Sequence, residues 1–599
     1  MRPLQISAIA LLTLPALAQK TEIRLDTGDA AGANFSSIPQ MCANGDNVYV
    51  AWNDTRNGQS DIYFQRSTDR GESWLAMDVR LDTDTAGSAQ SLQPAMTCFG
   101  NTIYVVWSDF RNGGSLGADL YMNVSTDGGQ TWLTNDVRVD QDALGSSASR
   151  CPVLCADSGG VYVAWLDDRN LFNDVYFNRS TDNGATWLAS DILVNTNGAG
   201  LAMSTCPSIA CANGAPGTIY VGWNDFRSGS PDVYINVSTD GGLTFAGADI
   251  RMDTDPAGAA SSSYVSIAAE GTKAYVAWWD SRNGADDIYL NYTTDSGATW
   301  LVADIRLDTD VAGSFLSNWP EVAVDGNNVY VVWEDWRLTA TTSCPAAVFG
   351  NYSNDGGATW QTNDIMISRQ PVCSTAGPDH TPALPQVTAD SGAVFVIWTD
   401  TRSGLQDIYY NRSLDAGANW LNQDLRLDTD PAGSSFSTSP AIAAGSSHIY
   451  VAWEDDRNGG TDIFFNVPYA LHSYGAGKAG TGGFVPSLSG DGRGTIGSTF
   501  TMNIDDVVGG AVGALLVGIP PRASLSLLGG TVHLNPLTSF PLPVGGPAGV
   551  GGAGSAALPL SIPNDEAFVG LGLLFQFLPI DSGATRGVSI SNGFELRMG

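Results

Sequence analysis

Three tryptophans of this chain stand outside its repeated pattern and offer ligand chemistry. The sequence has 17 tryptophans, of which all but three recur at equivalent positions. The three exceptions are Trp279, Trp319 and Trp336. Rigid aromatic rings with one polar edge stack well on the apolar face of a sugar, so these residues indicate a carbohydrate-binding surface. The alternative is that they pack against the insertion between Leu338 and Val348.

Non-repeated charged residues supply candidates for acid–base chemistry near these rings. Hydrolysis of a glycosidic bond needs one group that donates a proton and one that activates the attacking nucleophile. The catalytic candidates are Glu321, Arg369, Arg150 and Asp379. His380 joins the three tryptophans as a candidate for ligand binding.

Pairs of aspartates recur between the strands of successive repeats. Closely spaced carboxylates beside Gly and Ser can supply the oxygen ligands that Ca²⁺ prefers, and the formal charge of -34 favours cations. Aspartate is equally a turn residue, and no copy has the full spacing of an EF-hand loop. Calcium is therefore one of two interpretations, and no other cofactor is expected. The pairs considered as metal ligands are Asp82/Asp84, Asp308/Asp310 and Asp428/Asp430.

A repeat of about 55 residues positions these candidates. Each copy contains an apolar strand that ends in a Trp-x-Asp-x-Arg segment. The fifth copy predicts four strands, at 265–269, 274–278, 287–292 and 304–307. Short alternating strands at this period indicate a radial β-architecture in which no unit buries its apolar face alone. The anchoring tryptophans are Trp52, Trp107, Trp165, Trp223, Trp278, Trp333, Trp398 and Trp453.

The two ends of the repeat array predict how the ring closes. The segment 22–27 matches the fourth strand of a repeat but has no first three strands before it. The last repeat has three strands, ends near Val467 and lacks a fourth. We therefore predict an all-β, eight-bladed β-propeller that the N-terminal strand closes, which removes two open sheet edges.

Seven copies of a Ser/Thr-x-Asp-x-Gly motif with a terminal aromatic residue carry a family resemblance. The motif resembles the Asp-box of the sialidase-type BNR propellers. In that family it is a structural hairpin on the face away from the active site, so the resemblance implies the fold and no catalytic role. The eight Trp-x-Asp-x-Arg copies are likewise interpreted as structural ion pairs. The Asp-box copies span 67–74, 125–132, 180–187, 238–245, 293–300, 353–360 and 413–420.

The resemblance also implies an active site that this chain does not reproduce. The family grips a carboxylate with three arginines, the first in an Arg-Ile-Pro motif, and uses a Tyr/Glu pair with an Asp acid. Here Ser37 stands before Ile38-Pro39, and only Arg150-Cys151-Pro152 is a partial match. We therefore expect binding of a glycan or polysaccharide without sialidase chemistry. The alternatives are a glycoside hydrolase of the exo-α-sialidase type and a structural component of an extracellular matrix.

The termini predict export. Residues 1–18 have a short apolar run and a small-residue cleavage site typical of a signal peptide. The propeller is expected over 19–468, a Gly-rich linker over 469–484 and a small β-sandwich over 485–599, similar to a C-terminal module of exported bacterial proteins. We expect a secreted or cell-surface bacterial protein. Its negative charge disfavours nucleic acid, no apolar run is long enough for membrane insertion, and the oligomeric state is left open.

Eight cysteines agree with an oxidising compartment. Equivalent positions in neighbouring repeats suggest three disulfides, and a fourth pair, Cys344 and Cys373, brackets the long insertion. Connectivity cannot be fixed from spacing alone. The three suggested pairs are Cys42 with Cys98, Cys155 with Cys211, and Cys151 with Cys206.

Overall fold

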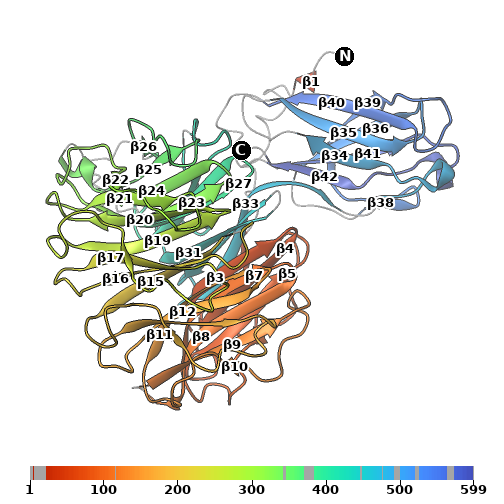
Figure 1. Cartoon of the computed structure of the whole chain (residues 1–599). Coiled ribbons are helices and arrows are strands. Elements are labelled where there is room, and N and C mark those ends of the chain that lie inside the picture. The colour runs from red at the N-terminus through yellow and green to blue at the C-terminus, as the bar shows by residue number, and fades with distance from the viewer. Residues whose placement is uncertain are drawn as a thin grey trace. The chain divides into compact units, whose positions relative to one another are not determined.

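The structure is a computed structural model, and the chain divides into two compact units. One comprises residues 22–446 with 450–466, and the other comprises 1–21, 447–449 and 467–599 (Figure 1). The residues that the structure describes are 4–5, 22–114, 117–212, 214–340, 346–369, 383–421, 423–445, 448–474, 477–491, 499–519, 525–562 and 572–597.

The first unit consists of four-stranded antiparallel blades, eight of them among the described residues. Each follows the order A, B, C, D from its inner to its outer strand, and seven are separate sheets. Their bounds are β3 (Ser36–Asn44), β4 (Asn47–Asp54), β5 (Asp61–Ser67), β6 (Val79–Arg80); β7 (Ser91–Phe99), β8 (Thr102–Gly113), β9 (Gly117–Ser125), β10 (Val137–Arg138); β11 (Ser149–Asp157), β12 (Gly160–Asp167), β13 (Asp174–Ser180), β14 (Ile192–Leu193); β15 (Ser204–Cys211), β16 (Ile219–Asp225), β17 (Asp232–Ser238), β18 (Ile250–Arg251); β19 (Ser262–Glu270), β20 (Lys273–Asp280), β21 (Asp287–Thr293), β22 (Ile305–Arg306); β23 (Ser317–Asp325), β24 (Asn328–Asp335), β25 (Ala347–Ser353), β26 (Ile365–Met366); and β27 (Ala383–Asp390), β28 (Ala393–Asp400), β29 (Asp407–Ser413), β30 (Leu425–Arg426).

The eighth blade closes the ring as the sequence predicts. It contains β31 (Ser437–Ala444), β32 (His448–Asp455) and the first part of β33 (Asp462–Tyr474). Its outer strand is the N-terminal β2 (Ile23–Arg24), which pairs antiparallel with Phe464 and Phe465 of β33. The inner strand β31 also contacts β3 of the first blade, so the inner strands are neighbours all the way round.

The apolar core lies between neighbouring blades. In one cluster Tyr49 and Phe64 of the first blade pack with Val105 and Trp107 of the second. All eight anchoring tryptophans are fully buried. Burying each large apolar side chain contributes about 1.5–3 kcal/mol relative to leaving it exposed, and here both faces of a blade depend on its neighbours.

The Asp-boxes are hairpin staples, as predicted. In the first copy the Asp69 carboxylate accepts the backbone N–H of Ser73 at 2.8 Å and its hydroxyl at 2.6 Å. The aromatic residue of each box joins two blades: Trp132 meets Phe64 edge to face at 4.7 Å between ring centroids. These contacts make the motif architectural.

The second unit is a β-sandwich. Its core combines Phe500, Leu515 and Phe575 from both sheets. One sheet contains β1 (Leu4–Gln5), β40 (Gly554–Ser561), β35 (Thr499–Val507) and β34 (Ser487–Asp491); the other contains the end of β33 with β42 (Gly593–Arg597), β41 (Gly572–Pro579), β36 (Val512–Gly518) and β39 (Pro536–Pro543). The remaining elements of this unit are the hairpin β37 (Leu525–Leu527) and β38 (Gly530–Val532) and the single turns η2 (Thr481–Gly483) and η4 (Thr585–Gly587). The single turn η1 (Arg337–Ala340) belongs to the first unit, between β24 and β25.

Two expectations about the termini meet the described residues only in part. The signal peptide expected over 1–18 lies outside them, apart from β1. Within the expected linker, residues 469–474 continue β33, because the glycine-rich run begins only at Gly475. Across the described part of the chain, no helix has the length and hydropathy needed to cross a bilayer.

Candidate ligand site at one mouth of the propeller

Each inner strand carries a bulge near its start, and one residue of each bulge has a positive φ between 49° and 59°. Such a conformation costs a non-glycine residue about 1–3 kcal/mol and is concentrated at functional sites. A proline follows in all blades but the fifth, which suits a bulge because proline has no N–H to pair. The eight bulge residues are Ile38, Gln93, Cys151, Cys206, Tyr264, Trp319, Leu384 and Ser439.

These bulge residues differ from blade to blade although their backbone conformation is shared. They lie at the start of strand A, beside the end of strand B, as the pairing of Ser263 with Trp279 shows. The Asp-box turns lie between strands C and D, at the other end of each blade. The mouth formed by the bulge residues is therefore where this repeat protein varies, and we take it as the candidate site.

Glu321 is the central polar group of this mouth. Its carboxylate accepts hydrogen bonds from Ser266 Oγ at 2.9 Å, Tyr264 OH at 3.2 Å and Gln386 Nε2 at 3.5 Å. These donors come from the fifth and seventh blades, on either side of the sixth. Burial raises the pKa of Glu321 to about 7, although the three hydrogen bonds oppose the shift. The carboxyl can therefore both hold and release a proton near neutral pH.

An aromatic pair adjoins this carboxyl. The rings of Trp319 and Tyr264 meet edge to face, with centroids 4.7 Å apart and planes at 79°. The Trp319 side chain is 39% exposed, whereas Tyr264 is more buried and bonds Glu321. The tryptophan thus presents an open ring that a buried neighbour holds in place.

Two cavities open among the inner strands. The first, about 340 Å³, is lined by Glu321, Tyr264, Ser266, Cys206 and Gln40 among others. The second, about 350 Å³, is lined by Ile38, Leu384, Gln386, Ser439 and again Gln40. Each lies within the range of small-ligand sites, and Gln40 is common to both.

The other two off-pattern tryptophans have different surroundings. Trp279 is half-buried and packs, together with Leu338, against the core between the fifth and sixth blades. Trp336 donates its indole N–H to Glu334, whose pKa burial raises to about 7. Of the three, Trp319 therefore has the most open ring, whereas Trp279 packs against the core between two blades.

The charged candidates are not brought together. Arg150 is exposed beside the bulge residue Cys151. Arg369 contacts the seventh blade, where its backbone N–H donates a hydrogen bond to Asp424 at 2.9 Å. The backbone N–H of Thr83 makes the equivalent hydrogen bond to Asp136 between the first and second blades. Asp379 and His380 lie outside the described residues.

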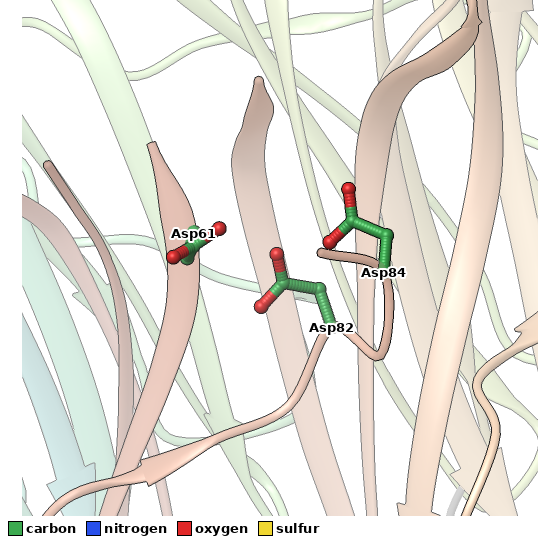
Figure 2. Close-up of side chains that lie close together, drawn as sticks. All are labelled: Asp61, Asp82 and Asp84. Carbon is green, nitrogen blue, oxygen red and sulfur yellow. The ribbon is translucent and has the colours of Figure 1, made fainter. Parts of the chain in front are cut away.

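The aspartate pairs belong to clusters of three in which an arginine is already present. Oxygens of Asp61, Asp82 and Asp84 lie within 4.8 Å of one another (Figure 2). Arg80 Nη2 is 3.0 Å from both Asp61 and Asp82 and also pairs with Asp84. A guanidinium thus provides the cation for these carboxylates, and the set does not fit a calcium cage. Arg306 has this place beside the Asp308/Asp310 pair, and Arg426 has it beside the Asp428/Asp430 pair. The equivalent arginines of two further blades are Arg138 and Arg251.

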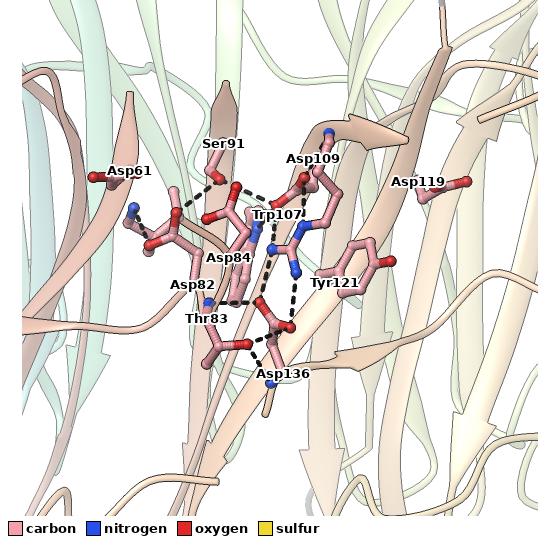
Figure 3. Close-up of polar contacts among 12 residues, drawn as sticks. Asp61, Asp82, Thr83, Asp84, Ser91, Trp107, Asp109, Asp119, Tyr121 and Asp136 are labelled. Carbon is pink, nitrogen blue, oxygen red and sulfur yellow. Dashed lines mark hydrogen bonds and ion pairs between the residues drawn. The ribbon is translucent and has the colours of Figure 1, made fainter. Parts of the chain in front are cut away.

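The Trp-x-Asp-x-Arg segments form a repeated polar layer, which Figure 3 shows for the second blade. Asp109 accepts hydrogen bonds from the Trp107 indole at 2.9 Å and from Arg111 Nη2 at 2.6 Å. Arg111 lies 4.0 Å above the Tyr121 ring and reaches Asp136, which accepts the N–H and hydroxyl of Thr83 from the first blade. The structural interpretation of this motif is confirmed.

The sequence-based selection missed four polar residues of the mouth: Tyr264, Ser266, Gln386 and Gln40. Their position in the repeat could have identified them. Tyr264 is a bulge residue, and the other three stand two residues after the bulge residue of their blade, the position that Glu321 has in the sixth blade. A search for positions that vary between repeats would have found them.

The seven Asp-box motifs and the closed ring of four-stranded blades decide the fold. It is a β-propeller fold. No family model matches the chain, and no curated protein does. Among solved structures, similarity is found to the GH93 α-L-arabinofuranosidase of Fusarium graminearum in complex with arabinobiose, at 15% identity and a TM-score of 0.33 over 52% of this chain and 92% of that one.

Two further structures are similar at comparable levels. A mutant of Trypanosoma rangeli sialidase displaying trans-sialidase activity has 10% identity and a TM-score of 0.33 over 98% of this chain and 97% of that one. The polysaccharide lyase Uly1 has 12% identity and a TM-score of 0.40 over 66% and 94%. Similarity at this level carries no information about substrate or chemistry.

Proposed function

We propose that this protein is an exported carbohydrate-binding protein whose ligand site is the mouth of the propeller at the fifth to seventh blades. The observation that carries the proposal is the open Trp319 ring, held edge to face by Tyr264 beside the hydrogen-bonded Glu321 carboxyl. The predicted signal peptide supports export, as does the disulfide between Cys42 and Cys98.

The chemistry of the cluster matches a sugar. A pyranose or furanose ring has an apolar face that stacks on indole and hydroxyls that need directional partners. Around Glu321, the side chains of Gln386, Ser266 and Gln40 offer both donors and acceptors. The positive φ of the bulge leaves the Trp319 ring partly exposed to solvent. A tryptophan with only a packing role would be buried in the core instead.

The charge balance of the mouth favours a neutral glycan. Glu321 and Glu334 are acidic, and Glu454 accepts hydrogen bonds from the Ile38 N–H at 3.1 Å and the Ser439 hydroxyl at 2.9 Å. Arg150 is the cationic candidate beside the bulges, set against these three acidic groups and the formal charge of -34. An anionic sugar would be repelled unless it reached Arg150.

Affinity electrophoresis of the full-length protein tests the proposal. The gels contain arabinan, dextran, alginate or polysialic acid, and we expect retardation by at least one neutral polysaccharide. Trp319→Ala should abolish retardation, because it removes the stacking surface. Phe99→Ala is the matched control, since Phe99 is 44% exposed but lies where strand A turns into strand B, away from the bulges. Loss of retardation in both variants, or in neither, would refute the assignment.

A hydrolase acting at the same mouth is the second candidate, because Glu321 has the raised pKa that a general acid needs. Glu454 would then supply the second carboxylate. Release of reducing sugar from arabinan, abolished in both Glu321→Gln and Glu454→Gln, would establish hydrolysis. Retardation of the protein without release of sugar would leave binding as the function.

A further inference from the structure

We propose that four cysteines of the third and fourth blades form two inter-blade disulfides, Cys155–Cys211 within the inner strands and Cys151–Cys206 in the wall of the ligand cavity. The second would be an accessible cross-link that controls the shape of the site. Only this control of the site rests on the proposed function; the cross-links themselves do not.

Internal symmetry carries the first pair. Cys42 and Cys98 are disulfide-bonded between the first and second blades, with Cα atoms 6.1 Å apart. Cys42 is the seventh residue of β3, and Cys98 is the eighth residue of β7. Cys155 and Cys211 have the same two places in β11 and β15. The two pairs are therefore equivalent positions of one repeat scaffold.

Contacts in the third and fourth blades agree with this equivalence. Cys155 and Cys211 are free thiols in the structure, and they lie on the neighbouring inner strands β11 and β15. Burial, together with the nearby Cys211 thiol, raises the pKa of the Cys155 thiol. Both cysteines pack against the core cluster between these blades, as Cys42 and Cys98 do in theirs. Two thiols in contact need only to lose two electrons and two protons to form one S–S bond.

The second pair follows from the bulges. Side chains at adjacent bulge positions meet at two other places: Gln93 Nε2 is 3.5 Å from Cys151 Sγ, and the ring centroids of Tyr264 and Trp319 are 4.7 Å apart. Cys151 and Cys206 hold the adjacent bulge positions of the third and fourth blades, with φ of 50° and 49°. Both are free thiols in the structure, and burial raises the pKa of Cys206 with an added contribution from the Cys151 thiol, as expected of neighbouring groups.

The Cys151–Cys206 cross-link is the one expected to affect ligand binding, because Cys206 lines the cavity. Cys206 is exposed and lines the cavity that also contains Glu321 and Tyr264, whereas Cys155 and Cys211 are partly buried. A disulfide there would fix the part of the cavity wall that Cys206 contributes, next to the blade of Tyr264. Its formation needs an oxidant such as oxidised glutathione or a disulfide oxidoreductase, which accepts the two electrons and two protons and is reduced to thiols.

The cross-links are tested on full-length protein that has been exported and purified without reductant. It is denatured in iodoacetamide and digested with thermolysin, which cuts before Val153, Leu154 and Ile209 and so separates the cysteines of each strand. We expect linked peptides that contain Cys155 with Cys211 and Cys151 with Cys206. Carbamidomethylated Cys151 and Cys206 without a linked peptide would overturn the second bond.

Control of the site is tested with two double variants. Cys151→Ser/Cys206→Ser should weaken binding of the retarding polysaccharide threefold to tenfold with little change in Tm. Cys155→Ser/Cys211→Ser, the matched control, should lower Tm and leave binding unchanged. Equal binding by the first variant and the wild type would overturn the role in the site. If none of the four polysaccharides binds but the linked peptides are found, the proposed function fails and the cross-links stand.

Discussion

The polar layer around the Trp-x-Asp-x-Arg segments and the mouth of the propeller differ in how they use the repeat. In the layer, all eight blades keep the aspartate and the arginine, and the arginine lies about 4 Å above an aromatic ring in each. At the mouth the eight bulge residues share a positive φ but not a side chain. A repeated side chain marks a scaffold requirement, and a repeated backbone with varied side chains marks freedom for a ligand site.

The cluster of Arg80 with Asp61, Asp82 and Asp84 is replaced in the sixth blade, and the replacement shows which part of it the scaffold requires. Met366 stands in place of Arg80, Ser368 in place of Asp82 and Ala347 in place of Asp61. The Ile62 N–H donates to Asp82 Oδ1, and the equivalent Val348 N–H donates to Ser368 Oγ. The scaffold thus requires a hydrogen-bond acceptor there, while arginine and carboxylates are lost together.

The largest effect should come from breaking the repeated layer. Asp109→Ala removes one partner of a buried pair and leaves Arg111 with Asp136 alone, which should cost about 3–5 kcal/mol of unfolding free energy. Denaturant unfolding measures it. Asp46→Ala is the control, because the Asp46–Arg70 pair lies at the surface and should contribute at most about 1 kcal/mol. Similar losses in both variants would contradict the structural role of the layer.

The comparison of the two clusters predicts a compensation. Arg80→Met alone leaves two buried carboxylates and the partly buried Asp84 without their cation and should destabilise the fold by about 3–5 kcal/mol. Adding Asp61→Ala and Asp82→Ser, which copies the sixth blade, should recover most of that loss. If the triple variant is no more stable than the single one, the charges are needed for some purpose other than mutual pairing.

Stability should also fall as pH rises above about 4. Burial raises the pKa of Asp82 and of Asp308 to about 8, and the nearby Asp61 and Asp287 carboxylates add to the two shifts. A carboxyl that binds its proton more tightly in the folded state stabilises the fold below its unfolded pKa, and this is lost as pH rises to 8. We expect Tm a few degrees lower at pH 8.5 than at pH 5, measured by calorimetry.

Carboxyls whose pKa is lowered in the folded state limit the stability at acid pH. Hydrogen bonds from Thr131 and Thr186 lower the pKa of Asp127 and Asp182 in the Asp-boxes to about 2. Their contribution is present above pH 4 and lost toward pH 2. Asp82→Asn, which copies Asn195 of the third blade, should flatten the loss at alkaline pH. A Tm that rises from pH 5 to pH 8.5 would contradict the buried, protonated carboxyls.

Sequence analysis predicted the blades but named only some residues of the mouth, among them Glu321 and Trp319, for a physical reason. Trp107, Asp109 and Arg111 are local and repeated, so spacing alone shows them. The Glu321 site instead joins Tyr264 and Ser266 of the fifth blade with Gln386 of the seventh. These donors lie up to 65 residues from Glu321 in the sequence. Spacing likewise suggested calcium for the aspartate pairs, although the arginine stands two residues before each pair, as Arg80 does before Asp82 and Asp84. Spacing does not show that Arg80 also reaches Asp61 on another strand and bridges all three carboxylates.

The smallest effect should come from one hydroxyl at the mouth. Tyr264→Phe keeps the edge-to-face contact with Trp319 but removes the hydrogen bond to Glu321. Because that bond favours the ionised carboxyl, its loss should raise the pKa of Glu321 above about 7. Polysaccharide binding should weaken about twofold, and the midpoint of its pH profile should move to higher pH. Tyr104→Phe, whose hydroxyl instead meets Asn183, should leave that profile unchanged. Equal profiles in both variants would mean that Glu321 does not contact the ligand, and the comparison of scaffold with mouth would then rest on Trp319 alone.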